Sequence, residues 1–305
     1  MRGEEESMAN GLSGEILVGI VTRNRRDKLI KTLAECSFQG FNDIVVVDNG
    51  SSDGTREFLL GERGVETIIS DRNEGGSGGF NRIMRHFLEH SRHGWLLMFD
   101  DDAYPSFSAS ALRAFLLSEA AANRPAYALK VLYTDGTMCE MNRPGLNILE
   151  THPFRALHGD HHVQESAGSC LVDFASFVGI VLKRDTIAQS GYVSKEFFIY
   201  SDDTYYTLSV SSRLGQIRYC PEFVLIHDCN RTSRRLLNHD SARLQREVAN
   251  KIVLIREYSK FQTHYVVLYV ARLIFKNPTR VLEILHASYT GIFANLQLYR
   301  NERAC

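Results

Sequence analysis

The first hundred residues of the chain alternate between short apolar runs and segments with helical spacing. Four runs favour strands, and they lie at residues 16–21, 44–47, 65–69 and 95–99. Three of the four are almost continuously apolar, as expected for strands that are covered on both faces of a parallel sheet. Between the runs, apolar residues within 29–36 recur with a helical period, residues 52–55 open another helix, and residues 80–90 are expected to form a further helix. This alternation predicts a doubly wound α/β sheet.

Polar residues follow each predicted strand. They lie at residues 22–25, 48–51, 71–73 and 100–102. Because ligands of doubly wound sheets collect at the carboxyl ends of the strands, side chains that suit bases, ribose and phosphate would converge on one crevice. Each segment alone is a weak signal, since Asp48 to Ser51 is also a favourable turn. Four such segments in register favour a binding site.

Three adjacent carboxylates, Asp100, Asp101 and Asp102, follow the apolar run 95–99. Carboxylates at the exit of a buried strand repel one another, so the fold needs a cation to neutralise them. Oxygen ligands of this kind suit Mg²⁺ or Mn²⁺. An acidic loop or a helix N-terminus is the alternative, because Asp also caps helices.

Glycines dominate residues 75–79, which suggests a dinucleotide-binding loop at first sight. That fingerprint should follow the first strand, whereas residues 22–25 after the first strand contain no glycine. The glycines are better explained as letting a sugar or diphosphate approach the backbone at a helix N-terminus. A flexible connector is the alternative.

Four segments together resemble one enzyme family: VTRNR at 21–25, VVVDNGSSDGT at 45–55, DRNEGGSGGFNR at 71–82 and FDDDA at 99–103. The chain resembles inverting family-two glycosyltransferases of the GT-A fold, and it is most similar to the bacterial galactofuranosyltransferase and rhamnosyltransferase branch. The resemblance implies a GT-A catalytic domain at residues 15–230. Residues 1–14 would then be a flexible N-terminal tail, and residues 231–305 a basic helical appendage.

The resemblance also implies a donor site and a metal site. The implied donor contacts are Thr22, Asn24, Arg25, Asp48, Asn73, Gly76, Asp100 and Asp101. Asp48 would bind the base, while Asn73 and Gly76 would line the diphosphate or the donor sugar. Asp100 and Asp102 would hold Mn²⁺ or Mg²⁺, with Asp102 directly on the ion. His227, at the end of an apolar run at 224–227, resembles the family's late metal ligand, although a satisfied strand-end histidine is the alternative.

Residues 198–203 resemble the family's segment that carries the catalytic base. Inverting transfer needs a carboxylate that removes the proton of the acceptor hydroxyl as attack occurs from the opposite face. We expect Asp203 to be this base and Asp202 to orient it or to bind the acceptor. The alternative is a helix N-cap and a first-turn carboxylate that open a helix at 204–214.

The C-terminal region is basic, although the whole chain has a net charge of only −1. Residues 231–305 hold 13 Lys and Arg against 5 Asp and Glu. The apolar stretch 265–275 contains Arg272 and is too short to span a bilayer. A basic helical region suggests peripheral contact with an anionic membrane, while a helical subdomain or a homo-oligomer interface is the alternative. With no apolar signal segment at residues 1–14, the expected location is cytoplasmic, or peripheral on the inner face of the cytoplasmic membrane.

The expected partners are a UDP- or dTDP-linked sugar, with galactofuranose or rhamnose as the transferred group, and a hydroxyl of a glycan or lipid-linked glycan; no nucleic acid is expected. The six cysteines are scattered without a CxxC pair, so their spacing predicts neither a zinc site nor a disulfide framework. A sugar nucleotidyltransferase would need a Gly-rich loop with basic residues after the first strand, which is missing. An inactive glycan- or membrane-binding scaffold is the non-enzymatic alternative.

Overall fold

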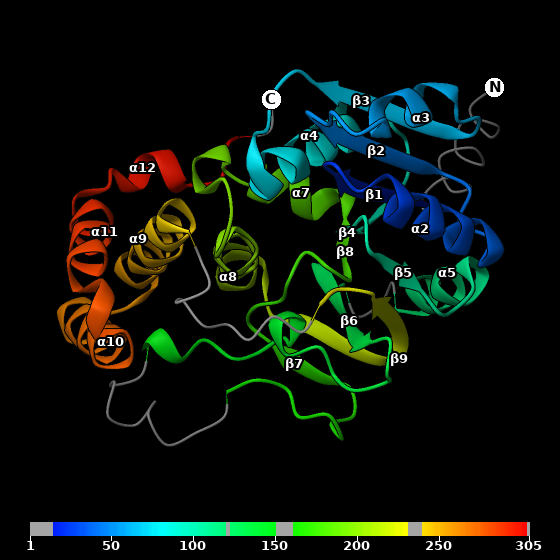
Figure 1. Cartoon of the computed structure of the whole chain (residues 1–305). Coiled ribbons are helices and arrows are strands. Elements are labelled where there is room, and N and C mark those ends of the chain that lie inside the picture. The colour runs from blue at the N-terminus through cyan, green and yellow to red at the C-terminus, as the bar shows by residue number, and fades with distance from the viewer. Residues whose placement is uncertain (1–14, 120–122, 151–160, 231–239, 304–305) are drawn as a thin grey trace.

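The computed structural model describes residues 15–119, 123–150, 161–230 and 240–303. The predicted tail 1–14 lies outside the described residues, and the predicted boundary after residue 230 adjoins another undescribed segment. The strands of the described residues are β1 (Ile16–Thr22), β2 (Ile44–Asn49), β3 (Val65–Ser70), β4 (Trp95–Asp100), β5 (Ala103–Pro105), β6 (Ala126–Tyr133), β7 (Cys170–Val172), β8 (Ile180–Lys183) and β9 (Ile217–His227). They form one sheet in the order β3-β2-β1-β4-β8-β6-β9-β5, and β7 also pairs with β9 (Figure 1).

The first four strands are mutually parallel, so their carboxyl ends share one edge of the sheet. These are the four strands that the sequence predicts. Beyond β4 the sheet is mixed: β8 is antiparallel to both β4 and β6, and β6 runs parallel to β9. The short strands β5 and β7 pair antiparallel with β9.

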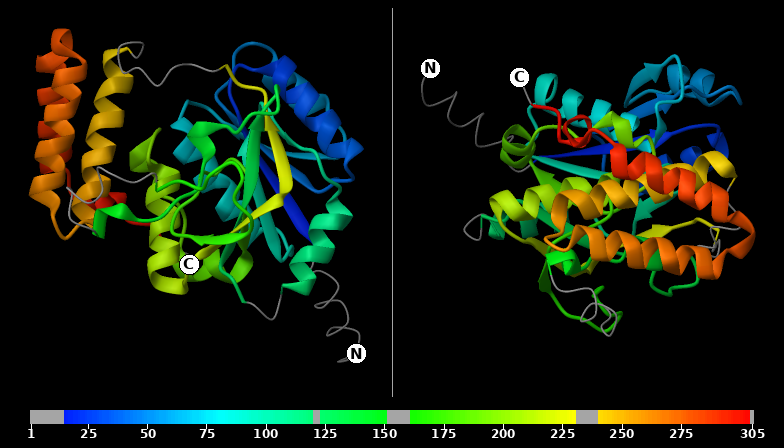
Figure 2. Two further views of the ribbon diagram at one scale, coloured as in Figure 1. Left: turned by 90° about the horizontal axis from the view of Figure 1, so that it is seen from below. Right: turned by 90° about the vertical axis from the view of Figure 1, so that its left-hand side faces the viewer.

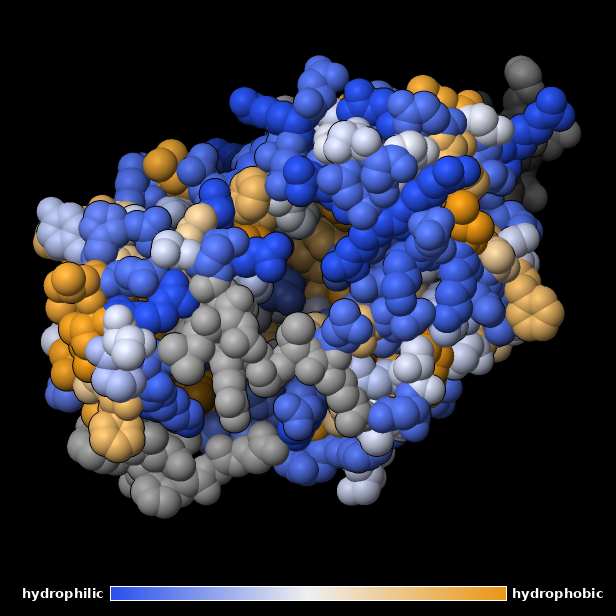
Figure 3. Space-filling model, in the orientation of Figure 1, coloured by the Kyte–Doolittle hydropathy of each residue, from blue (hydrophilic) through white to orange (hydrophobic). Residues whose placement is uncertain are grey.

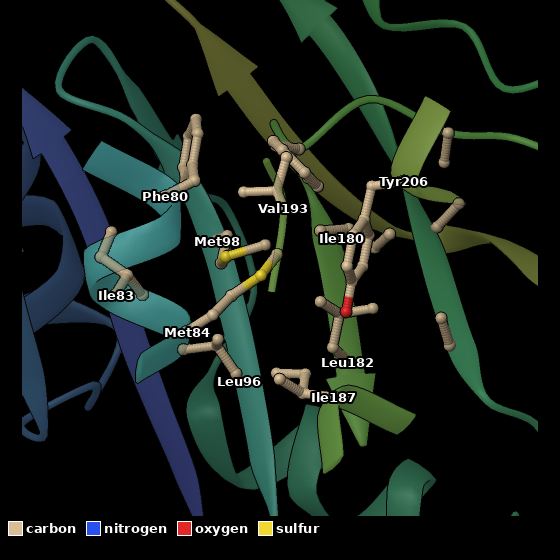
Figure 4. Packing of buried hydrophobic residues seen from close by; sticks show 14 of the residues in the cluster. Phe80, Ile83, Met84, Leu96, Met98, Ile180, Leu182, Ile187, Val193 and Tyr206 are labelled. Atoms are coloured by element: carbon tan, nitrogen blue, oxygen red, sulfur yellow. The ribbon is translucent and has the colours of Figure 1, made fainter. Parts of the chain in front are cut away.

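Helices cover both faces of the sheet. One face packs against α2 (Arg26–Phe38), α3 (Thr55–Gly61) and α5 (Ala109–Ser118). The other face packs against α4 (Gly75–Glu89), α7 (Arg184–Ser190) and α8 (Asp202–Leu214). On this second face, Met84 of α4 points toward Met98 of β4, and Tyr206 of α8 lies against Ile180 and Leu182 of β8 (Figure 4). Short 3₁₀ turns are η2 (Glu140–Asn142), η3 (Ile148–Glu150), η4 (Lys195–Phe197) and η6 (Pro278–Arg280).

Helix α4 begins at Gly75, five residues before the predicted start at Phe80. The glycines disfavour helix intrinsically, but close packing requires them. A Cβ on Gly79 would lie 2.5 Å from Val21 of β1, and a Cβ on Gly75 would overlap the carbonyl group of Phe198. The glycine-rich segment is therefore the first turn of a tightly packed helix and not a flexible connector.

The C-terminal region folds into α9 (Ser241–Tyr258), α10 (Gln262–Lys276), α11 (Val281–Phe293) and α12 (Leu296–Tyr299). These helices form a layer on the far side of α8 from the sheet (Figure 2). Tyr205 and Leu208 of α8 pack with Leu254 of α9, and Arg85 of α4 pairs with Glu302 at 2.6 Å. No helix of the described residues has the length and apolar character needed to cross a bilayer. The predicted α/β sheet with a C-terminal helical appendage is confirmed.

Candidate functional site

The three adjacent aspartates and His227 meet at the carboxyl edge of the sheet. Asp100 ends β4, and the turn after it leads into β5, whose Ala103 pairs with His227 of β9. This pairing brings His227 Nε2 to 3.1 Å from Asp102 Oδ1. Ligand atoms of Asp100, Asp102 and His227 lie within 4.8 Å of one another. The structure thus gathers the three residues that the sequence assigned to the metal.

Thr22, the last residue of β1, and Arg25, shortly after it, bind the aspartates. Thr22 Oγ1 donates a 2.7 Å hydrogen bond to Asp101 Oδ2. The guanidinium of Arg25 lies 2.5 Å from Asp102 Oδ2 and 3.4 Å from Asp101 Oδ1. Thr22 and Arg25, which the sequence assigned to the nucleotide, therefore contact the acidic residues of the site.

The pKa values of these groups depend on their burial and on the charges next to them. Burial raises the pKa of Asp101 to about 7 and the pKa of Asp100 to about 6. Burial also opposes the charged forms of Asp102 and His227, but the hydrogen bond between these two residues outweighs the effect of burial. The pKa of Asp102 is therefore lowered. The pKa of His227 is raised to about 10 by this hydrogen bond together with Cys139 and Asp100. The carboxylates are held by the positive charges of His227 and Arg25.

The residues present fit a divalent metal ion. Two carboxylates and one imidazole converge on one point, and the carboxylates would be charged next to a cation. Carboxylate ligands suit Mg²⁺ and Mn²⁺, and the imidazole ligand favours a transition ion such as Mn²⁺ over Mg²⁺. Binding would replace the proton on His227 Nε2, because only a neutral imidazole nitrogen ligates metal.

The second nitrogen of His227 is also engaged. Its Nδ1 lies 2.9 Å from Asn142 Oδ1, and the amide of Asn142 donates to Ser176 Oγ at 2.8 Å. The acceptor at Asn142 places a proton on Nδ1 and turns Nε2 toward the carboxylates. Metal-binding histidines are commonly oriented in this way by a hydrogen bond from their second ring nitrogen. Sequence reasoning missed Asn142, because the short 3₁₀ turn η2 that contains it carries no local motif.

Two cysteines flank the same imidazole. Cys139 Sγ donates to Asn142 Oδ1 at 3.0 Å and lies 3.8 Å from His227 Nδ1. Ligand atoms of Cys139, His227 and Cys229 lie within 4.8 Å of one another. The spacing of the cysteines along the chain does not predict this cluster, because Cys139 reaches His227 only in the folded protein. The local sequence shows only that Cys229 follows His227 by two residues.

Two further predicted donor contacts, Asp48 and Asn24, organise the neighbouring loops. The carboxylate of Asp48 is fully buried, accepts from the backbone N–H of Ser51 at 3.0 Å and pairs with Arg56 at 3.0 Å. Asn24 joins the loops after β1 and β2, since its Oδ1 accepts from the N–H of Ser52 at 2.7 Å.

Asn73 Oδ1 accepts from the N–H of Gly75 at the start of α4. Gly76 is half-buried, and nothing in the described residues would meet a Cβ there within 4 Å. The space next to Gly76 is the open part of the helix N-terminus.

Asp202 and Asp203 form the first turn of α8. Asp202 is buried, and its pKa is raised by burial and by the nearby charges of Asp203 and Asp100. Asp203 is less buried and accepts from the N–H of Thr204 at 2.6 Å. Two carboxylates in one turn thus have different surroundings.

The segment before Asp202 has strained backbone. Phe198, Tyr200 and Ser201 have φ angles of 56°, 71° and 65°, in the left-handed region that non-glycine residues avoid. The side-chain amide of Asn250, on α9, donates to the carbonyls of residues 197, 199 and 200 at 2.9 to 3.1 Å. The C-terminal helices therefore hold the segment that positions Asp203.

Asp203 faces a pocket of ≈ 610 Å³ between the sheet domain and the C-terminal helices. Other parts of its lining come from η2, η3, α9 and α10. The lining combines apolar and aromatic side chains, such as Leu254 and Tyr265, with the basic side chains of Lys251 and Arg272.

The chain is similar to known glycosyltransferases. The family model described as Glycosyl transferase family 2 matches residues 17–120. Glycosyltransferase AglJ of Haloferax volcanii is 24% identical over 167 residues, which cover 54% of this chain and 52% of AglJ. Galactofuranosyltransferase GlfT1 of Mycolicibacterium smegmatis is 26% identical over 199 residues, which cover 62% of this chain and 63% of GlfT1. The chain thus spans between half and two thirds of the length of these relatives.

Solved structures show the same fold at low identity. TarS of S. aureus has a TM-score of 0.52 at 15% identity, over 94% of this chain and 54% of that chain. A structure of GalNAc-T7 with UDP, GalNAc and Mn²⁺ has a TM-score of 0.59 at 13% identity, over 84% of this chain and 50% of that chain. The predicted GT-A fold is confirmed by these neighbours.

Proposed function

Because the chain carries a glycosyl transferase family 2 domain, we propose that it is a metal-dependent, inverting glycosyltransferase that uses a nucleoside-diphosphate sugar. The observation that carries the proposal is the convergence of Asp100, Asp102 and His227 at the carboxyl edge of the sheet, next to a carboxylate that faces a pocket. Structures of TarS with UDP and UDP-GlcNAc, and of GalNAc-T7 with UDP and Mn²⁺, support a UDP-linked donor and Mn²⁺. The name of GlfT1 favours galactofuranose over rhamnose as the transferred sugar.

Asp100, Asp102 and His227 would hold the metal ion. When bound, the ion acts as a Lewis acid that stabilises the leaving diphosphate. Arg25, which is half-exposed, pairs with Asp102 and Asp101 and supplies a second positive charge near that diphosphate. The hydrogen bond from Thr22 fixes the carboxylate of Asp101.

Asp203 removes the proton of the acceptor hydroxyl. Its carboxylate lies on the pocket, whereas Asp202 is buried and its raised pKa favours the neutral acid. Of the two carboxylates, Asp203 is the one that lines the pocket and that the acceptor can reach. A single displacement with the base on the acceptor side inverts the anomeric centre.

The pocket next to Asp203 is the proposed acceptor site. An acceptor that combines apolar groups with a negative charge would match its apolar lining and its basic residues Lys251 and Arg272. A lipid-linked glycan carries both features, because its lipid is apolar and its linking phosphates are anionic. This chemistry favours a lipid-linked glycan over a free glycan.

The C-terminal helices also present an apolar surface. It consists of Phe275 at the end of α10 and of side chains along α11, namely Leu282, Leu285, Tyr289, Ile292 and Phe293. Apolar atoms gather at this left edge of the molecule (Figure 3). With Arg272 and Lys276 nearby in sequence, this surface suits peripheral attachment to an anionic membrane that presents a lipid-linked acceptor.

Calorimetric titration with UDP tests the donor site directly. We expect UDP to bind the wild-type protein more tightly with Mn²⁺ than with EDTA, and we expect Asp102→Asn to lose that difference. Asp185→Asn is the matched control, because Asp185 is exposed and lies on α7, outside the site. Absence of UDP binding in the presence of Mn²⁺ would overturn the proposed donor.

A further inference from the structure

His227 lies between two clusters of candidate metal ligands among the described residues. Its Nε2 faces the oxygen ligands Asp100 and Asp102, as described above. Its Nδ1 faces the opposite side, where the sulfur atoms of Cys139 and Cys229 lie within 4.8 Å of the imidazole and of each other. One imidazole ring therefore separates hard oxygen ligands from soft sulfur ligands.

Both thiols are held in place by the fold. The backbone N–H of Cys139 donates to the carbonyl of Val131, in β6, at 2.9 Å. Cys229 follows Asp228, whose N–H donates to the carbonyl of Asp102 at 2.8 Å and whose carboxylate pairs with Lys28 at 2.9 Å. The sulfur atoms thus need no large backbone movement to act together.

The distances suit a tetrahedral ion. Zn–S bonds of ≈ 2.3 Å and Zn–N bonds of ≈ 2.0–2.1 Å place sulfur and nitrogen ligands about 3.6 Å apart, and two sulfurs about 3.8 Å apart. Cys139 Sγ lies 3.8 Å from His227 Nδ1. A fourth polar atom, Asn142 Oδ1, lies beside these ligands, at 2.9 Å from His227 Nδ1 and 3.0 Å from Cys139 Sγ.

We propose that Cys139, Cys229 and His227 Nδ1 form a second metal site that binds a thiophilic divalent cation such as Zn²⁺. Thiolates and imidazole select such ions over Mg²⁺ and Mn²⁺. Binding releases the two thiol protons and the proton on Nδ1 to solvent, while Nε2 keeps its proton.

The two sites compete for one imidazole, a step that rests on the proposed function of Asp100, Asp102 and His227. When Nδ1 carries the proton and donates to Asn142, Nε2 is free to ligate the ion at the carboxylates. When Nδ1 ligates Zn²⁺, a neutral ring carries its proton on Nε2, which then donates to Asp102. Zn²⁺ at the thiol site therefore weakens Mn²⁺ binding at the carboxylate site.

Cobalt spectroscopy tests the thiol site without reference to glycosyl transfer. Metal-free protein, kept reduced with a phosphine, is titrated with Co²⁺, which gives thiolate-to-cobalt charge-transfer absorption in the near ultraviolet only when sulfur is a ligand. Wild type and the control Cys170→Ser, which replaces an exposed cysteine, should show this absorption, and it should saturate at one equivalent. The double variant Cys139→Ser/Cys229→Ser should lack it. If the double variant does not fold, Cys229→Ser alone serves, since Cys229 is only partly buried; its absorption should be about half as intense, because one of the two thiolate ligands is lost.

Absence of the absorption in wild type, or its persistence at the wild-type intensity in the serine variant, overturns the thiol site. The shared imidazole is tested separately by adding excess Mn²⁺ to the cobalt titration, because linkage requires each ion to weaken the binding of the other. Mn²⁺ has little affinity for thiolates, so it should raise the Co²⁺ concentration at half-saturation of the absorption at least tenfold in wild type and leave it unchanged in Asp102→Asn. An equal shift in both proteins, or none in wild type, overturns the competition, and the absorption itself shows whether the thiol site stands.

Discussion

His227 Nε2 lies 3.1 Å from Asp102 Oδ1, although 125 positions separate the two residues in the chain. The contact follows from the antiparallel pairing of β5 with β9, which sets Ala103 opposite His227. The next residue, Asp228, fixes the register, because its N–H donates to the carbonyl of Asp102. A cation site at this edge therefore depends on the mixed half of the sheet as much as on the parallel half.

Replacing the proposed base should separate transfer from donor binding. Asp203→Asn keeps the shape of the side chain but removes its ability to accept a proton. We expect the rate of transfer to fall by about 10²–10⁴-fold, the usual contribution of a positioned general base. UDP affinity, measured by calorimetry, should stay unchanged.

Asp202→Asn is the matched comparison for that variant. Because Asp202 is buried and favours its neutral form, an amide should replace it with a smaller loss of rate. A near-normal rate for Asp203→Asn, or a larger loss for Asp202→Asn, would assign the base to another carboxylate.

Asn142 should control the metal affinity of His227. In Asn142→Ala the imidazole loses the acceptor of its Nδ1 proton, so the ring is free to turn Nε2 away from Asp102. We expect Mn²⁺ affinity, measured by electron paramagnetic resonance, to fall by about 10–100-fold. Asn142→Asp keeps an acceptor and should keep the wild-type affinity. An unchanged Mn²⁺ affinity in Asn142→Ala would show that the ring is held by other contacts.

Asn250 should affect turnover from a distance. In Asn250→Ala the carbonyls of residues 197, 199 and 200 lose their common donor, and the left-handed segment before Asp203 can relax. We expect a free energy of unfolding lower by about 1–3 kcal/mol and a lower kcat with unchanged Mn²⁺ affinity.

Asn277 offers the matched control for Asn250. It is also buried, and its amide donates to the carbonyl of Leu273 at 2.9 Å within α10. Asn277→Ala should therefore cost stability and leave kcat at the wild-type value. An equal loss of kcat in both variants would mean that general destabilisation, and not the position of Asp203, explains the effect.

The apolar surface of α11 should determine membrane binding. The double variant Leu282→Asp/Tyr289→Asp places two acidic groups on side chains that are 82% and 63% exposed. Co-sedimentation with anionic vesicles should fall in this variant and, for wild type, should fall as salt rises, because each basic residue near the surface contributes about 1 kcal/mol that salt screens.

Phe38→Asp is the control for the membrane experiment. Phe38 is 83% exposed at the end of α2, away from the C-terminal helices. Its replacement should not alter vesicle binding. Equal recovery of wild type on neutral and anionic vesicles, or no recovery on either, would favour a dimer interface at α11, which sedimentation equilibrium would then detect.

The strands and their polar ends were predictable because both depend on local sequence. An apolar run such as 95–99 favours a buried strand, and the carboxyl ends of parallel strands must share one edge. The start of α4 was not predictable, because glycine disfavours helix and only the close approach of Val21 and Phe198 explains Gly75 and Gly79.

The second layer of the site was not predictable from single segments. Asn142 ends the short turn η2 and Cys139 directly precedes that turn. Both reach His227 only through the pairing of β6 with β9, where Tyr133 lies opposite His227. Long-range pairing of this kind depends on the register of the whole sheet, which no short motif encodes. The roles assigned to the site residues stay predictions until the variants above are measured.

Turnover of a panel of sugar nucleotides, which includes UDP-galactofuranose and dTDP-rhamnose, tests metal-dependent glycosyl transfer most directly. Wild type should release nucleoside diphosphate with Mn²⁺ and give a product of inverted anomeric configuration by NMR. Saturating EDTA, or the Asp102→Asn substitution, should lower the rate by on the order of 100-fold or more, while Asp185→Asn keeps it. Full turnover in EDTA, or by a folded Asp102→Asn variant, would contradict the metal-dependent mechanism.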